Sequence, residues 1–476
     1  MLFNSIQFLL FFIVVTTAYF VIPHKFRWVL LLAASCYFYM AFVPIYILIL
    51  AGTIVVDYFA GIFIERSEGK NKRVFLIASL IANIGVLAMF KYYNFLNDNL
   101  TQLLGIANLT NPVPVLKILL PIGLSFHTFQ AMSYTIEVYR GNQKAEKHFG
   151  IYALYVMFYP QLVAGPIERP QNLLHQFHEK HVFDYDLMVE GLKQMAWGFF
   201  KKLVIADRLS IYVNAVYNNV DQHSGISLLV ATFFFSVQIY CDFAGYSDIA
   251  IGAAKIMGFR LMTNFKRPYL STSVSEFWKR WHISLSTWFK DYLYISLGGN
   301  RVAISRLIFN LFFVFLVSGL WHGANWTFVI WGGLNGLFLI LAYIYNPYKN
   351  KVNMFLGLSN FPKLHHILQI GLTFILIAFS WIFFRATNFS EAYTIIVKII
   401  HFKGPLFIDR PILLVYDFIL VGLLLTLEIK REFFNQTFTV FEHNNFMLKN
   451  IAYACLVIFI LLFGVFDGSQ FIYFQF

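Results

Sequence analysis

Two histidines, His282 and His322, lie in tryptophan-rich segments whose residue types suit catalysis. His322 belongs to Trp321-His322-Gly323 inside a strongly apolar region, where an ionisable side chain is costly and indicates a function. His282 ends the basic segment 278–282. One polar loop and one apolar helix separate the two, which predicts one imidazole near the cytoplasmic surface and the other at membrane depth. This arrangement suits a catalyst that passes an acyl group across a bilayer.

Acyl transfer to a hydroxyl group needs a base that takes the hydroxyl proton while the new bond forms. A neutral imidazole can accept that proton, and we assign this role to His322. Each histidine also has a purely structural interpretation. His322 can be a buried side chain that a neighbouring carbonyl group satisfies, and His282 can be an interfacial residue between tryptophan anchors.

The composition places the chain among polytopic membrane proteins. Hydrophobic residues make up 59% of the 476 residues, aromatic residues 19% and charged residues 13%, a balance that soluble domains of this size do not have. Loops that face anionic lipid explain the net charge of +12. The basic residues do not form a separate domain, so we expect no binding to nucleic acid. Cys36, Cys241 and Cys455 show neither metal-ligand spacing nor a disulfide pattern, so we expect no metal site.

We therefore predict an all-α fold with about 11–13 membrane helices of roughly twenty residues each, in one membrane domain over residues 1–476. Region 150–217 is less regular, and there we expect a re-entrant or interfacial element at 151–164 and one crossing through Lys201 and Lys202. The clearest apolar segments are 5–22, 28–43, 45–63, 74–96, 116–138, 226–256, 307–321, 326–346, 364–384, 412–427 and 450–467.

The distribution of Lys and Arg predicts the orientation of the chain. Basic residues cluster in the loops at 65–73 and 140–147, whereas the loop at 97–115 has none. The positive-inside rule then places the N-terminus and the C-terminal residues 471–476 outside, and the basic region 260–306 in the cytoplasm.

The same counting gives the depth of His322. Sixteen residues separate it from Arg306, which is about 24 Å along a helix. The hydrocarbon core is about 30 Å thick, so we expect His322 past the midplane, towards the outside. His282 belongs to the cytoplasmic half.

Six motifs carry a family resemblance: Gln161 to Ile167, Tyr240 to Asp248, Ser275 to Ser286, Asp291 to Tyr294, Leu297 to Arg301 and Gly319 to Ala324. They resemble the membrane-bound O-acyltransferase (MBOAT) family, and most closely its bacterial branch that includes the alginate O-acetyltransferase membrane subunit. The resemblance covers most of the chain. It implies the MBOAT fold, with His322 as the catalytic histidine and His282 as the second, upstream histidine.

The resemblance also implies a cytoplasmic acyl donor, which we expect to be acetyl-CoA, entering beside His282. Lys279, Arg280, Lys266 and Arg267 can attract the phosphates of CoA. Positive-inside topology alone also explains each of these four residues. The implied activity is transfer of acetyl groups across the bacterial cytoplasmic membrane for O-acetylation of an extracytoplasmic polysaccharide of the alginate type. The implied partner is an extracytoplasmic SGNH-hydrolase-like acetyltransferase.

The C-terminal residues 471–476 read Phe-Ile-Tyr-Phe-Gln-Phe. They resemble the FxYFxF ending that recurs in bacterial acyl-transfer systems, where the tyrosine is proposed as a covalent acyl carrier. The resemblance implies that role for Tyr473, because a covalent relay splits one difficult transfer into two easier steps. The alternative is an aromatic anchor at the membrane interface.

Two other functions remain open at this stage. Within the enzyme class, the alternative is a D-alanyl or other acyl transferase that acts on a cell-wall polymer. Outside it, the alternative is a transporter or scaffold whose histidines tune a pathway or stabilise the bundle. Transporter folds usually contain internal repeats, and the sequence shows none.

Overall fold

The computed structural model describes residues 1–117, 120–163, 165–434, 445–466 and 472, and all regular structure within these residues is helical. The chain divides into two compact units, and each unit is made of two stretches of sequence. The first unit contains Met1–Met195 and Tyr246–Met262, and the second contains Ala196–Gly245 and Thr263–Phe476. The single membrane domain over residues 1–476 stays a prediction.

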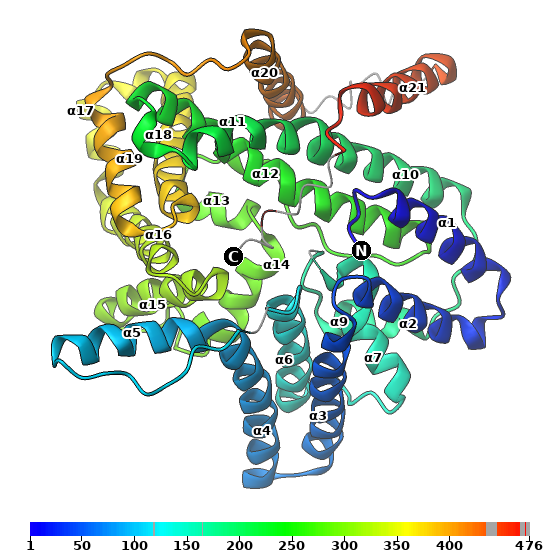
Figure 1. Cartoon of the computed structure of the whole chain (residues 1–476). Helices are drawn as coiled ribbons and strands as arrows, with labels where there is room; N and C mark the ends of the chain where they lie inside the picture. The colour runs from blue at the N-terminus through cyan, green and yellow to red at the C-terminus, as the bar shows by residue number, and fades with distance from the viewer. Residues whose placement is uncertain (118–119, 164, 435–444, 467–471, 473–476) are drawn as a thin grey trace. The chain divides into compact units, whose positions relative to one another are not determined.

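In the first unit, α3, α4 and α6 pack against one another, as Figure 1 shows, and α2 packs on α1 and α7. The helices of this unit are α1 (Ile6–Val21), α2 (His24–Met40), α3 (Ile47–Arg66), α4 (Gly69–Leu87), α5 (Tyr93–Ile106), α6 (Leu124–Arg140), α7 (Phe149–Met157), α8 (Tyr159–Leu162), α9 (Pro170–Leu173), the start of α10 (Tyr185–Phe199) and the end of α12 (Gly225–Ile256), with short turns η1 (Pro44–Tyr46), η2 (Ala88–Tyr92) and η3 (Leu174–Phe177).

In the second unit, α15 packs along α16, and α16 packs against α18. The helices that follow α10 here are α11 (Asp207–Tyr217), most of α12, α13 (Val274–Arg280), α14 (Ile283–Trp288), α15 (Ile304–His322), α16 (Trp326–Tyr345), α17 (Lys349–Phe355), α18 (Pro362–Arg385), α19 (Phe389–His401), α20 (Pro411–Phe433) and α21 (Phe446–Phe463), with the turns η4 (Phe200–Ala206), η5 (Val220–Gln222), η6 (Pro268–Leu270), η7 (Phe289–Tyr294), η8 (Asn346–Tyr348) and η9 (Leu358–Asn360).

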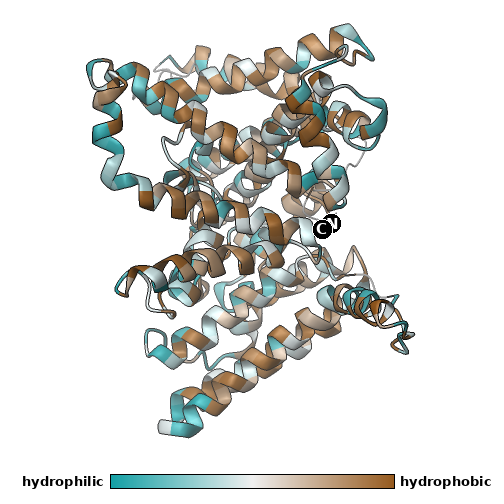
Figure 2. Ribbon diagram, turned by 90° about the vertical axis from the view of Figure 1, so that its left-hand side faces the viewer, coloured by the Kyte–Doolittle hydropathy of each residue, from teal (hydrophilic) through white to brown (hydrophobic). Residues whose placement is uncertain are grey.

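Within the described residues, eight helices are long and apolar enough to cross a membrane. Figure 2 shows hydrophobic residues along the long helices and hydrophilic residues mainly at their ends and in turns. Every predicted apolar segment corresponds to a helix, although α1, α2 and α6 are only 16–17 residues long and are not among the eight. The eight are Pro44–Arg66, Gly69–Ile106, Gly225–Ile256, Ile304–His322, Trp326–Phe355, Pro362–Arg385, Pro411–Phe433 and Phe446–Phe463. The chain is therefore a multi-pass membrane protein.

The predicted loop at 97–115 is wrong in its first half. Helix continues from Gly69 through η2 to the end of α5 at Ile106. Neither Pro nor Gly interrupts residues 86–104, so nothing in that sequence breaks the helix. The loop begins only at Ala107.

Where the sequence predicts a re-entrant or interfacial element at 151–164, the structure has the short helices α7 and α8. Residues 150–157 of α7 are all buried. The predicted crossing through Lys201 and Lys202 is not among the eight apolar helices. These two lysines, together with Asp207 and Arg208, make this stretch too polar. Residues 200–206 form a π-helical turn there instead, a local irregularity that is common at functional sites.

Two glycines set the close approach of α15 and α16. A Cβ atom on Gly319 would lie 2.2 Å from the carbonyl oxygen of Phe328, and one on Gly332 would lie 2.2 Å from that of Phe315. Small residues at this interface let the two backbones pack closely, as is common in membrane helices. His322 follows Gly319 by three residues, so this contact fixes the position of the histidine.

Candidate active site

His282 occupies a sharp turn in the second unit, between α13 and α14. Its backbone has φ 42° and ψ 56°, in the left-handed region. Residues other than glycine adopt this conformation rarely, and such strain is concentrated at functional sites. The turn directs the chain so that the imidazole is buried, with 1% of the residue exposed.

Asn264 holds the His282 turn and determines its tautomer. The Oδ1 atom of Asn264 accepts hydrogen bonds from the backbone N–H of Ser284 at 3.2 Å and from its hydroxyl group at 2.9 Å. Because the backbone N–H can only donate, this side-chain atom is an oxygen. The Nδ1 atom of His282 lies 3.1 Å from the same oxygen and must therefore carry the proton. This leaves Nε2 as the basic nitrogen of the neutral ring.

Burial also keeps His282 neutral. The residue lies outside the eight membrane-spanning helices. Burial lowers the pKa of its imidazole to about 3, so the ring carries no charge at physiological pH. Neutral imidazole is the form that accepts a proton or a hydrogen bond.

His322 is the last residue of α15 and lies within an aromatic cluster. Its residue is 5% exposed. The rings of Trp331 and Phe384 lie 5.0 Å and 5.4 Å from its imidazole, measured between centroids. The cluster excludes water from one side of the ring. The next residue, Gly323, ends the helix, and a Cβ atom there would clash with the ring of Phe328 at 2.1 Å.

The structure brings both predicted histidines to the same indole ring. Trp321 lies 4.9 Å from the ring of His322 and 6.3 Å from the ring of His282. The ring of Phe243 of α12 lies 4.5 Å from the ring of His282, measured between centroids. The two imidazoles, forty residues apart in sequence, therefore belong to one buried aromatic site. Their catalytic roles stay predictions.

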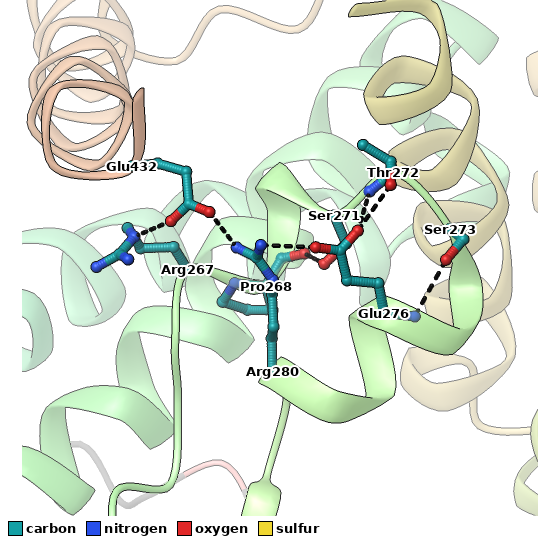
Figure 3. A network of polar contacts seen from close by, with 8 residues as sticks. All are labelled: Arg267, Pro268, Ser271, Thr272, Ser273, Glu276, Arg280 and Glu432. Carbon is teal, nitrogen blue, oxygen red and sulfur yellow. Dashed lines mark hydrogen bonds and ion pairs between the residues drawn. The ribbon is translucent and has the colours of Figure 1, made fainter. Parts of the chain in front are cut away.

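Two of the four predicted phosphate-binding residues are held in ion pairs. The guanidinium groups of Arg267 and Arg280 both point towards Glu432 of α20, as Figure 3 shows, at 2.5 Å and 2.8 Å. Arg280 also pairs with Glu276 at 2.6 Å. Although burial acts in the opposite direction, the hydrogen bonds from Thr272 and the charge of Arg280 lower the pKa of Glu276. These contacts stabilise the segment that carries His282.

The two predicted lysines, Lys266 and Lys279, are exposed. Lys279 lines a mainly apolar cavity of about 410 Å³, a volume typical of small-molecule sites. Lys290, which the sequence interpretation did not select, is exposed and lines the same cavity. The wall includes Ile283 and Ser286 beside His282, together with Phe315 and Ser318 of α15.

One indole pair connects this cavity to His322. Trp278 lines the cavity, and its ring lies 5.7 Å from that of Trp331, which in turn contacts His322. Sequence reasoning missed Asn264 and Trp331, because neither has a spacing that relates it to a histidine. The predicted acyl carrier Tyr473 lies outside the described residues.

Within the described residues, a buried pair of histidines lies in a membrane-spanning helical protein, an arrangement suited to an enzyme embedded in the membrane. The profile of the MBOAT, membrane-bound O-acyltransferase family matches residues 147–384. This range contains both histidines and the cavity. The chain belongs to the membrane-bound O-acyltransferase family.

Its relatives include two kinds of O-acetyltransferase. The chain is 39% identical to a probable alginate O-acetylase, AlgI, of Pseudomonas aeruginosa over 397 residues, which cover 83% of this chain and 74% of the relative. It is 35% identical to a peptidoglycan O-acetyltransferase of Helicobacter pylori over 401 residues, covering 79% and 74%. A teichoic acid D-alanyltransferase of Bacillus subtilis is 27% identical over 281 residues, covering 57% and 70%.

Proposed function

We propose that this protein passes acetyl groups from cytoplasmic acetyl-CoA across the bacterial cytoplasmic membrane, for O-acetylation of an extracytoplasmic polysaccharide. The observation that carries the proposal is the buried pair His282 and His322 around Trp321. Acetyl transfer is favoured over D-alanyl transfer, because identity to the two O-acetyltransferases is higher than identity to the D-alanyltransferase. The N-terminus lies outside in this proposal.

The donor enters through the cavity beside His282. Lys279 and Lys290, exposed along its wall, attract the phosphates of CoA. The apolar lining accepts the pantetheine arm. Arg267 and Arg280 stabilise the wall of the cavity through their ion pairs with Glu432. Because these ion pairs already neutralise their charges, the two arginines contribute less to binding the phosphates of CoA.

His322 acts as the general base. It takes the proton of the hydroxyl group that receives the acetyl group. At the same time, the oxygen of that hydroxyl group forms a bond to the carbonyl carbon of the acetyl-CoA thioester. The C–S bond then breaks, and CoA leaves as the thiolate, which takes up the proton. An SGNH-hydrolase-like partner outside the membrane delivers the acetyl group to the polysaccharide. The identity to the probable alginate O-acetylase supports an acceptor of the alginate type.

The test of this proposal is His322→Ala. It removes the base from an otherwise intact bundle, so polysaccharide O-acetylation should fall to background while the protein remains in the membrane. His322→Gln, which keeps hydrogen bonding but cannot accept the proton in the same way, should be equally inactive. Acetyl content of the polysaccharide is measured at matched protein levels, and normal acetylation in either variant contradicts the proposal.

Trp331 is the residue that we propose to stabilise the developing oxyanion. Its Nε1–H group is buried and has no hydrogen-bond partner among the described residues, and its ring contacts His322. Preorganised donors of this kind are worth about 10²–10³-fold in rate. Trp331→Phe keeps an aromatic ring and removes the donor, so kcat should fall by about 100-fold with little change in KM. A kcat within about twofold of the parent value rules out this role.

A further inference from the structure

The chain that follows α21 is tied to the second unit at two points. The backbone N–H of Val465 donates a hydrogen bond to the carbonyl oxygen of Leu203 at 3.0 Å. The backbone N–H of Ile472 donates to Oδ2 of Asp242 at 2.7 Å. Ile472 is 4% exposed, and its side chain belongs to the hydrophobic core of this unit.

The site that receives this segment is built around a buried lysine. Lys202 lies on the π-helical turn η4, and its ammonium group is 2.7 Å from both Asp207 and Asp242. The three side chains are at most 4% exposed. Gly245 lets α12 approach the turn, since a Cβ atom there would lie 2.8 Å from the carbonyl oxygen of Gly198.

The charges of this site explain why it binds a backbone N–H. One ammonium group faces two carboxylates. Buried carboxylates are costly unless hydrogen bonds satisfy their remaining lone pairs. Oδ1 of Asp242 contacts Lys202, and Oδ2 takes the N–H of Ile472. Hydrogen bonds to a charged acceptor are the stronger kind, so this contact holds the segment firmly.

The docking point and the histidine site share helix α12. Asp242 precedes Phe243, whose ring lies 4.5 Å from His282. Consecutive residues of α12 therefore contact the C-terminal segment and the active-site histidine. Tyr473 is the next residue after Ile472 in the sequence.

We infer that Asp242 and Lys202 are positioning residues that dock the C-terminal segment through Ile472, and that transfer of the acetyl group requires this docking. The inference rests on the proposed function.

Ile472→Pro tests the docking directly, because proline has no backbone N–H to donate. Acetyl transfer should fall by about tenfold or more, as expected when a charge-assisted hydrogen bond is lost. Ile472→Val keeps the N–H and a β-branched apolar side chain, and should restore transfer to within about twofold. Equal activity of the proline and valine variants overturns the inference. If His322→Ala remains active, the proposed function fails. In that case amide exchange of the C-terminal peptide still decides whether the segment docks.

Amide exchange reports docking without any need for activity. In Asp242→Ala, hydrogen–deuterium exchange of the peptide covering 464–476 should be about tenfold faster than in the parent protein. Asp57→Ala is the matched control, since Asp57 is a fully buried carboxylate of α3 that binds Ser79 and Asn83. It should leave this peptide unchanged. Unchanged exchange in Asp242→Ala overturns the inference even if transfer is lost.

Tyr473→Phe separates docking from chemistry. It removes only the phenol hydroxyl group and leaves the N–H of Ile472 in place. Exchange of the C-terminal peptide should match the parent protein in this variant. Faster exchange in Tyr473→Phe contradicts docking through the backbone of Ile472.

Discussion

Asn264 determines which ring nitrogen of His282 carries the proton. Its Oδ1 accepts the Nδ1–H of the imidazole and the N–H of Ser284. The first hydrogen bond fixes the tautomer of His282. The second fixes the backbone turn that carries the His282 side chain. A histidine partner of this kind usually decides which ring nitrogen is available. Asn264 is therefore a positioning residue for His282.

Asn264→Ala should lower kcat by about tenfold, because a buried N–H donor loses its acceptor and the tautomer is no longer fixed. KM for acetyl-CoA should change less, since Asn264 does not line the cavity. Asn264→Asp returns an acceptor oxygen to the same place and should recover part of the lost kcat. The two parameters are measured on purified protein in liposomes. An alanine variant with the parent kcat contradicts the role.

At the residue scale, the sequence predicts the two histidines but not their surroundings. His322 stands out because it interrupts an apolar segment, and both histidines lie in motifs of the family. Asn264 lies eighteen residues before His282, and Ile472 lies 230 residues from Asp242. No single helix contains either pair, so only the folded chain brings these partners together.

At the scale of elements, the contact of α15 with α16 controls where His322 lies. The carbonyl oxygen of Phe315 occupies the space that a side chain on Gly332 would need. Backbone atoms cannot move aside as a flexible side chain can. The close packing of α15 and α16 therefore depends on Gly332, and His322, the predicted catalytic residue, ends α15.

Gly332→Ala should therefore reduce both stability and activity, because its Cβ atom would lie 2.2 Å from a backbone oxygen. Overpacking of this kind costs about 1–3 kcal/mol. Gly333→Ala is the matched control, since its Cβ atom would meet Leu316 at an ordinary 3.6 Å. Thermal unfolding in detergent and acetyl transfer are measured for both. Equal melting temperatures would contradict the interpretation of this interface.

The helices themselves were largely predictable, because hydrophobic length is a strong signal in membrane proteins. Each of the predicted apolar segments overlaps a helix of the described residues. The errors lie where polarity and helicity disagree. Residues 97–106 are polar but helical, and 200–206 are helical but buried around Lys202, whose charge is compensated by carboxylates that the sequence does not reveal.

At the scale of the whole molecule, the orientation in the membrane decides which substrate reaches which histidine. The distribution of Lys and Arg predicts that the region around His282 lies in the cytoplasm. The exposed Lys266 and Lys279 belong to that region. The donor can use the cavity only if this orientation holds, since CoA is a charged cytoplasmic molecule that does not cross a bilayer.

Single-cysteine labelling tests the orientation. His282 is too deeply buried to be labelled, with 1% exposed, so the exposed neighbour Lys266→Cys is the suitable site. In a background without the native cysteines, a membrane-impermeant maleimide should modify position 266 in inside-out vesicles and not in intact cells. Thr110→Cys, exposed in the loop that lacks basic residues, should show the opposite pattern. Labelling of position 266 from outside would reverse the orientation and remove the cytoplasmic donor from the proposed mechanism.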